Sequence, residues 1–99
     1  MTRKEIRSSI FTILFRLDFT APEEFSEQID FAVEDLSEGR KFSDKDESYI
    51  RTKTSDVAAK LADIDALIGA NAQGWKLQRI GKAELTILRL AVYEMNYDE

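Results

Sequence analysis

The chain has 99 residues, a net charge of −5, and neither cysteine nor histidine. This length suits one domain whose core needs no covalent support, and the missing cysteines exclude disulfides and thiolate metal sites. Without histidine, zinc would have only carboxylate ligands, and the commonest general base and the best nucleophile of enzymes are absent. We therefore expect no metal, no cofactor and no catalytic residue.

The charges are distributed unevenly along the chain. Bases outnumber acids in residues 1–17, acids outnumber bases in residues 19–65, and residues 66–83 carry bases only. An acidic protein with two basic patches can bind nucleic acid locally while its remainder repels it. No apolar run approaches the roughly 18 residues of a membrane span, and no small-residue cleavage site follows the first apolar stretch. We expect a cytoplasmic protein without membrane contact.

Helical periodicity predicts a first helix from about Arg3 to Leu17 and a second from near Pro22 to Gly39. Pro22 suits the first turn of a helix, and Gly39 suits a helix end. Apolar residues recur at the spacings that place them on one helix face. The predicted inner faces are Ile6, Ile10, Ile13, Leu14 and Leu17 in the first helix and Phe25, Ile29, Ala32, Val33 and Leu36 in the second.

A long third helix is predicted from the capping residue Ser43 to near Gly69, with Asp46 at its third position as in a short capping box. At about 1.5 Å per residue it would span roughly 39 Å and serve as a spine for the others. A loop over residues 69–74 and a brief helix over residues 75–79 follow. The apolar stripe of the long helix is Ile50, Val57, Leu61, Ile64 and Ile68.

The last predicted helix, residues 82–96, is apolar over well over half of its circumference. Only Lys82, Thr86, Arg89 and Tyr93 form a continuous polar strip. A helix that is apolar nearly all round is buried on both sides. The preceding helices can cover one side, so we expect the other to be covered by a second copy in a homodimer, or by helices that follow residue 99 in a longer parent protein.

The first helix holds the clearest candidates for binding. Arg3, Lys4 and Arg7 near a helix start can contact phosphates, with help from free backbone N–H groups. Phe11 and Phe15, four residues apart, lie on a face beside the core stripe. In the alternative interpretation the basic residues only solubilise the N-terminus and the two phenylalanines complete the core.

A second group comprises Trp75, Lys76, Arg79 and Lys82. Aromatic and cationic side chains together suit unpaired RNA, whose bases stack on rings while its phosphates meet cations. A tryptophan in a loop can equally plug or cover a core. Glu84 lies inside the apolar arc of the last helix, where it either interacts with the helix dipole or offers an anion to a partner protein.

The segment WKLQRI at residues 75–80, followed by ILRLAVYE at residues 87–94, resembles the NusB family of bacterial transcription antitermination factors. The basic opening and the Leu14-Phe15 step are similar to the family's basic start and aromatic pair, and the resemblance covers essentially the whole chain. Phe15 stands where the family often has tyrosine, and Glu5 where it often has a basic or neutral residue. Family members also continue with further helices beyond the tyrosine-glutamate step. The long third helix is matched at Tyr49, Val57 and Ile64-Asp65.

The resemblance implies one NusB-like domain over residues 1–99, an antiparallel bundle of about five helices that lacks the family's last C-terminal helices. Residues 1–68 would form an N-terminal three-helix bundle, and residues 69–99 would begin a C-terminal helical subdomain. It also implies a non-catalytic function. With a small-subunit ribosomal protein, NusE, such a protein binds single-stranded boxA-type RNA in the RNA polymerase antitermination complex and supports ribosomal RNA transcription. The alternative to this function is a self-associating helical interaction module without RNA binding.

Carried over by position, the resemblance predicts an RNA-facing surface and a partner-protein surface on this chain. The predicted RNA-facing residues are Arg3, Lys4, Arg7, Trp75, Lys76 and Arg79, and the predicted partner-protein residues are Phe11, Phe15, Lys82 and Glu84.

Overall fold

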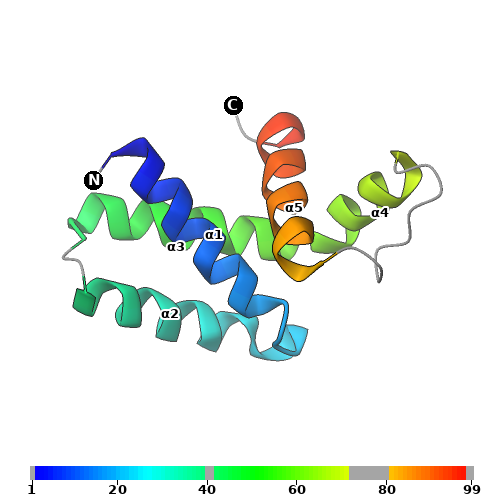
Figure 1. Cartoon of the computed structure of the whole chain (residues 1–99). Coiled ribbons are helices and arrows are strands. Elements are labelled where there is room, and N and C mark those ends of the chain that lie inside the picture. The colour runs from blue at the N-terminus through cyan, green and yellow to red at the C-terminus, as the bar shows by residue number, and fades with distance from the viewer. Residues whose placement is uncertain (1, 40–41, 72–80, 98–99) are drawn as a thin grey trace.

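The computed structural model describes residues 2–39, 42–71 and 81–97. Every regular element in these ranges is helical (Figure 1), which confirms the all-α prediction. The brief helix predicted over residues 75–79 lies outside the described ranges. In chain order the elements are α1 (Arg3–Leu17), the short 3-10 helix η1 (Pro22–Glu24), α2 (Phe25–Gly39), α3 (Asp44–Ala59), α4 (Leu61–Asn71) and α5 (Lys82–Asn96).

Helices α1 and α3 each pack against three of the other described helices. The chain reverses direction from α1 to α2 and again from α2 to α3, and α2 and α5 lie on opposite sides of α1 (Figure 1). Helix α1 contacts α2, α3 and α5, while α4 packs mainly against α5. This arrangement places the first turns of α1 between α3 and the C-terminal half of α5.

Two helix starts are fixed by side-chain caps. Thr2 accepts a hydrogen bond from the Glu5 N–H, and the Glu5 carboxylate accepts one from the Thr2 N–H, both at 3.1 Å. This reciprocal pair is a capping box, and it satisfies two donors at the start of α1. At α3 the predicted cap is confirmed, because the Ser43 hydroxyl accepts from the Asp46 N–H at 3.1 Å.

The prediction of one long third helix is wrong, because the helix is interrupted at Lys60. This residue has φ −104° and ψ 7°, and α4 leaves α3 at an angle (Figure 1). The Lys60 N–H still points at the carbonyls of Asp56 and Val57, and the Lys60 carbonyl accepts the first hydrogen bond of α4 from Ile64. No proline or glycine stands at the break, so the sequence gives no breaker signal there. Helix α4 also extends past Gly69 to Asn71.

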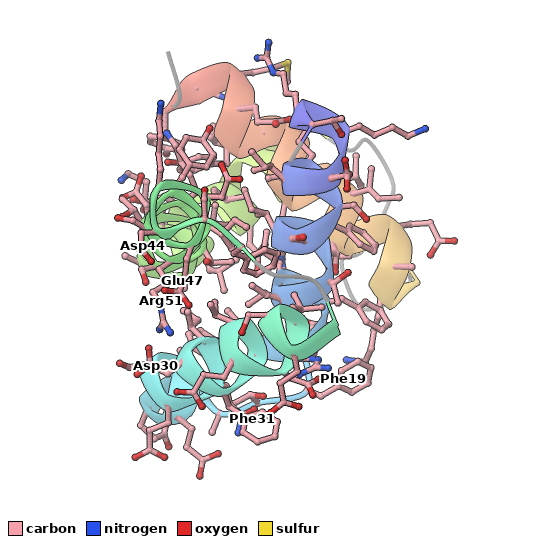
Figure 2. The ribbon with its side chains drawn as sticks, turned by 90° about the vertical axis from the view of Figure 1, so that its left-hand side faces the viewer. Phe19, Asp30, Phe31, Asp44, Glu47 and Arg51 are labelled. Carbon is pink, nitrogen blue, oxygen red and sulfur yellow. The ribbon has the colours of Figure 1, made fainter. Side chains whose placement is uncertain are left out.

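Ion pairs connect α2 to its neighbours. Arg51 of α3 reaches Asp30 of α2 and also lies 3.8 Å from Glu47 on its own helix (Figure 2). Arg16 of α1 donates to Asp35 of α2 at 2.6 Å. These pairs are partly exposed, so each contributes little to stability, and α2 is held chiefly by its apolar face.

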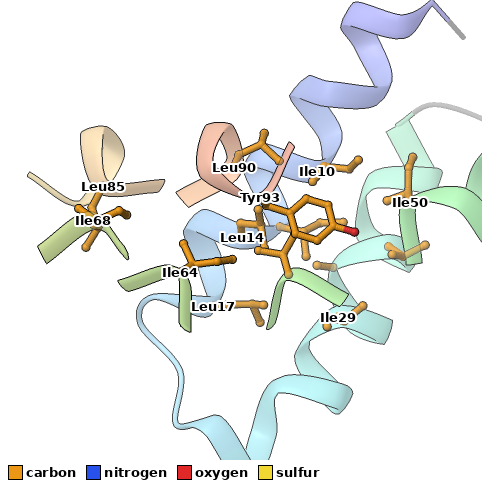
Figure 3. Close-up of a cluster of buried hydrophobic side chains, with 14 residues drawn as sticks. Ile10, Leu14, Leu17, Ile29, Ile50, Ile64, Ile68, Leu85, Leu90 and Tyr93 are labelled. Atoms are coloured by element: carbon orange, nitrogen blue, oxygen red, sulfur yellow. The ribbon is translucent and has the colours of Figure 1, made fainter. Parts of the chain in front are cut away.

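A single cluster of buried apolar side chains joins all five helices (Figure 3). The stripes predicted for α1 and α2 contribute as expected, and the break after α3 still leaves Ile64 and Ile68 buried, with Ile68 near Leu85. The cluster comprises Ile10, Ile13, Leu14, Leu17, Ile29, Ala32, Val33, Ile50, Val57, Ile64, Ile68, Leu85, Leu90 and Tyr93.

The bounds predicted for the last helix are confirmed, and most of its polar strip is buried. Thr86 and Tyr93 of the predicted polar strip are only 1% and 2% exposed, whereas Ile87 and Met95 are 55% and 76% exposed. Of the strip, Lys82 stays exposed, whereas the buried Thr86 hydroxyl donates to the Lys82 carbonyl of its own helix at 2.8 Å and the buried Tyr93 hydroxyl donates to Asp56 of α3 at 2.5 Å, so both buried hydroxyls are satisfied. Within the described residues, one side of α5 is covered and its Ile87–Met95 side is not.

We expect Ile13→Ala in α1 to lower the free energy of unfolding by about 2–5 kcal/mol, because Ile13 is fully buried and its truncation leaves a cavity. The same change at the exposed Ile87 of α5 should cost less than about 0.5 kcal/mol. Urea unfolding followed by circular dichroism measures both. Equal losses would contradict the orientation of α5.

Candidate functional site

The basic residues at the start of α1 differ in how they are held. Arg3 and Lys4 are exposed and form no ion pair with any residue in the described ranges. Arg7 is exposed too, but its Nε and Nη2 atoms donate to the two oxygens of Glu94 on α5, both at 2.8 Å. The hydrogen bonds and then the charge of Glu94 raise the pKa of Arg7. Arg7 therefore links α1 to α5, whereas Arg3 and Lys4 are available to a ligand.

A groove between α1 and α5 joins this basic opening to the aromatic residues further along α1. It has a volume of about 660 Å³. Lys4 and Arg7 lie at one end, Phe11 lies on the α1 wall, and Ile87 lies on the α5 wall. We call this the α1–α5 groove; it is lined by Arg3, Lys4, Arg7, Ser8, Phe11, Ile87 and Leu90.

Three phenylalanines form an aromatic strip along the outside of α1. The rings of Phe11 and Phe15 stack with centroids 6.2 Å apart, and Phe15 meets Phe19 edge-on at 5.3 Å. Phe11 also packs against the core, so it both completes the core and contributes to the strip. Phe19 is 64% exposed. Sequence reasoning missed Phe19, although the four-residue spacing of Phe11 and Phe15 continues to it, because Phe19 lies beyond the end of the first helix.

Lys82 at the start of α5 lies beside this strip. Its Nζ atom is 4.7 Å from the centre of the Phe19 ring and 3.0 Å from the Asp18 carboxylate. An ammonium group over an aromatic face is attracted by the ring's negative face. The structure therefore brings three of the four predicted partner-protein residues, Phe11, Phe15 and Lys82, to one surface.

Glu84 is placed differently. It is exposed in the first turn of α5, and its carboxylate folds back over Gly81, where an added side-chain carbon would collide with it. No contact in the described residues joins it to the aromatic strip. A negative charge at this position is favoured by the dipole of α5. The other predicted site residues, Trp75, Lys76 and Arg79, lie outside the described residues.

A model of the NusB family matches residues 4–99. The chain belongs to this family. Two relatives named transcription antitermination protein NusB, from Agathobacter rectalis and Lachnoclostridium phytofermentans, are 37% and 36% identical over 99 residues, which is the whole of this chain and 73% of each relative. A Listeria welshimeri protein of the same name is 34% identical over 97 residues, or 98% of this chain and 68% of that relative. No solved structure matches the chain.

Residues 87–94, one of the two segments on which the resemblance to the NusB family was recognised, connect α5 to the rest of the protein. Arg89 binds both oxygens of Asp65 on α4 at 2.8 and 2.9 Å, and it binds Asp18 after α1 at 2.9 Å. Tyr93 reaches α3 through Asp56, and Glu94 reaches α1 through Arg7. The NusB motif therefore positions α5, and sequence reasoning missed this because the acidic partners come from distant segments.

The carboxylates around this motif have shifted acidities. Burial would raise the pKa of Asp18, but the hydrogen bonds and charges of Lys82 and Arg89 together outweigh burial and lower it. Hydrogen bonds from Lys60 and then Tyr93 lower the pKa of Asp56. A carboxylate whose pKa is lower in the folded than in the unfolded state adds stability above its unfolded pKa of about 3.9 and loses it as the pH falls through the folded pKa.

No group of three or more aspartate, glutamate, histidine or cysteine residues among those described is arranged to hold a metal ion. No described helix is both long enough and apolar enough to span a bilayer.

We expect Asp18→Asn to lower the free energy of unfolding by about 1–3 kcal/mol at pH 7, since it removes a charged partner from two cations. The difference from the unsubstituted protein should shrink as the pH falls below the unfolded pKa of about 3.9 and through the lowered folded pKa of Asp18, because Asp18 is then protonated in both states. Urea unfolding across this pH range measures it. The matched change Asp30→Asn, at an exposed carboxylate paired with Arg51, should cost less than about 1 kcal/mol. A pH-independent effect of Asp18→Asn would contradict the assignment.

Proposed function

We propose that the chain is a non-catalytic RNA-binding adaptor of transcription antitermination. Together with a small-subunit ribosomal protein, NusE, it would bind single-stranded boxA-type RNA within the RNA polymerase antitermination complex. The names of the NusB relatives support the antitermination role. The observation that carries the RNA-binding role is the position of Arg3 and Lys4, two exposed cations with no charged partner among the described residues, at the capped start of α1 in a groove that leads to the aromatic strip.

On this proposal the start of α1 contacts RNA phosphates. The capping box occupies the Glu5 N–H, so we assign the phosphate contacts mainly to the side chains of Arg3 and Lys4. Arg7 can contribute the part of its guanidinium that Glu94 leaves exposed. The net charge of −5 repels RNA elsewhere, so affinity without the partner protein should be low and should fall as salt rises.

The aromatic strip is the surface we assign to the ribosomal protein. Aromatic side chains are enriched at the centres of protein interfaces, where they bury large areas at small entropic cost. Phe19 offers the most exposed ring of the strip, and Lys82 and Glu84 supply charges that can orient a partner. Because the α1–α5 groove connects this strip to the basic opening, RNA and protein partner would lie side by side.

We expect the double substitution Arg3→Gln/Lys4→Gln to weaken binding of single-stranded boxA RNA by about tenfold or more at low salt and to reduce the salt dependence by a slope of about 1.4. Fluorescence anisotropy with and without the ribosomal protein measures this. A matched control, Ala21→Glu/Ser26→Glu, makes the same change in net charge at exposed positions near and within α2. Equal weakening by both pairs would show that net charge alone governs binding.

We expect Phe19→Ala to weaken binding of the ribosomal protein by about tenfold or more, the loss typical of an aromatic residue central to an interface. Glu84→Lys should also impair this binding more than it impairs binding of RNA alone. Calorimetric titration measures both. Phe31→Ala, at a ring that is 61% exposed on α2, is the matched control and should have no effect. Unchanged affinity of the Phe19 variant would remove the strip from the interface.

A second candidate function is self-association without RNA binding, favoured by the uncovered Ile87–Met95 side of α5. A second copy could cover this side in a homodimer. Light scattering on the chain and on Ile87→Lys distinguishes the cases, because a homodimer formed there would dissociate when a charge is placed in its interface.

A further inference from the structure

A second basic and aromatic stripe runs along α3, apart from the surfaces described above. Lys45, Tyr49 and Lys53 follow one another at four-residue intervals and therefore lie on one face of the helix. All three line a groove of about 630 Å³ whose other walls come from α1 and α5. We call it the α3 groove. Its volume lies within the roughly 300–1,000 Å³ of typical ligand sites.

The α3 groove shares Arg3, Arg7 and Leu90 with the α1–α5 groove. Both grooves therefore meet at the first turns of α1. An occupant of the α1–α5 groove could continue around the start of α1 into the α3 groove along Arg3 and Arg7. The α3 groove is also lined by Asp46 and Glu94, so the basic path through it runs by Arg3 and Lys45. An extended, flexible polyanion such as single-stranded RNA can follow such a path.

The pairing of the cations favours this groove over other parts of α3. Of the described lysine and arginine residues, only Arg3, Lys4 and Lys45 have no charged partner among the described residues. Arg3 and Lys45 line the α3 groove. On the side of α3 that faces α2, by contrast, Arg51 is neutralised by Asp30 and Glu47 (Figure 2).

Tyr49 supplies an aromatic surface between these cations. Its side chain is 45% exposed. The Lys53 Nζ atom lies 5.6 Å from the centre of the Tyr49 ring and 5.9 Å from that of the Tyr93 ring. One ammonium group therefore makes a cation–π interaction with each ring. Tyr49 is thus an exposed, positioned ring beside cations that have no charged partner among the described residues. Single-stranded RNA binds to such surfaces, because its bases stack on the ring and its phosphates contact the cations.

We propose that the α3 groove binds one nucleotide of single-stranded RNA, with its base stacked on Tyr49 and its flanking phosphates in contact with Arg3 and Lys45. This inference rests on the proposed RNA-binding function and extends the RNA path from α1 onto α3. The four-residue spacing of Lys45, Tyr49 and Lys53 is present in the sequence, but only the groove indicates that this face of α3 is a binding surface.

The test uses the full chain with a short, unstructured, fluorescein-labelled RNA oligonucleotide, and it measures affinity by anisotropy at low salt. Tyr49→Ala should weaken binding about fivefold or more, the loss expected when one stacked base loses its ring. Tyr49→Phe should bind like the unsubstituted chain, because the ring face is kept. Phe31→Ala, which removes an exposed ring from α2, should also bind normally. Circular dichroism checks that all variants remain folded.

Lys45→Gln provides an independent readout, since loss of one phosphate contact should reduce the salt dependence of binding by a slope of about 0.7. If Arg3→Gln/Lys4→Gln weakens binding while Tyr49→Ala and Lys45→Gln do not, the α3 groove is excluded and the α1 surface stands. If Tyr49→Phe is as weak as Tyr49→Ala, stacking is excluded. If the chain binds no RNA even with the ribosomal protein present, both this inference and the proposed function fail.

Discussion

Arg89 is the residue on which the placement of α5 depends. Its guanidinium lies mostly out of solvent and binds Asp65 with both of its parallel N–H groups and Asp18 with a third. A buried guanidinium is costly unless its donors are satisfied, so only a small range of α5 orientations is compatible with this side chain. The end of α1, the start of α4 and the middle of α5 are thereby fixed relative to one another.

Both candidate surfaces follow from that orientation. With Arg89 turned inward, Tyr93 and Glu94 one turn later come within reach of α3 and α1, and Lys82 two turns earlier comes to the aromatic strip. The same rotation leaves Ile87 outside. The positions of both surfaces therefore depend on the ion pairs of Arg89. A substitution of Asp18 or Asp65 would shift α5 and so alter both surfaces.

The fold was predictable where one helix carries its own signal. The bounds of α1 and α5, the cap at Ser43 and the apolar stripes of α1 and α2 follow from spacing within a single segment. The break at Lys60 was not predictable because no proline or glycine marks it, and the inward polar strip of α5 was not predictable because its partners are distant in the chain. Helical periodicity predicts that tyrosine and arginine face solvent. It carries no information that Asp18 and Asp65 bind Arg89, or that Asp56 binds Tyr93, in the folded protein.

The candidate site shows the same division. The basic opening and Phe11 with Phe15 were visible as a cluster in sequence, whereas Phe19 and Tyr49 were not, since each gains meaning only from a neighbouring helix. Net charge was the least informative quantity. At −5 it argues against RNA binding, but it does not tell which cations are left for a ligand, because most described cations form ion pairs within the protein. Among the described residues, the cations without a charged partner are Arg3 and Lys4 in the first turn of α1 and Lys45, which lines the α3 groove together with Arg3, and these are the cations that a polyanion would meet there. A binding surface in an acidic protein is therefore better located by asking which cations the fold leaves unused than by counting charges.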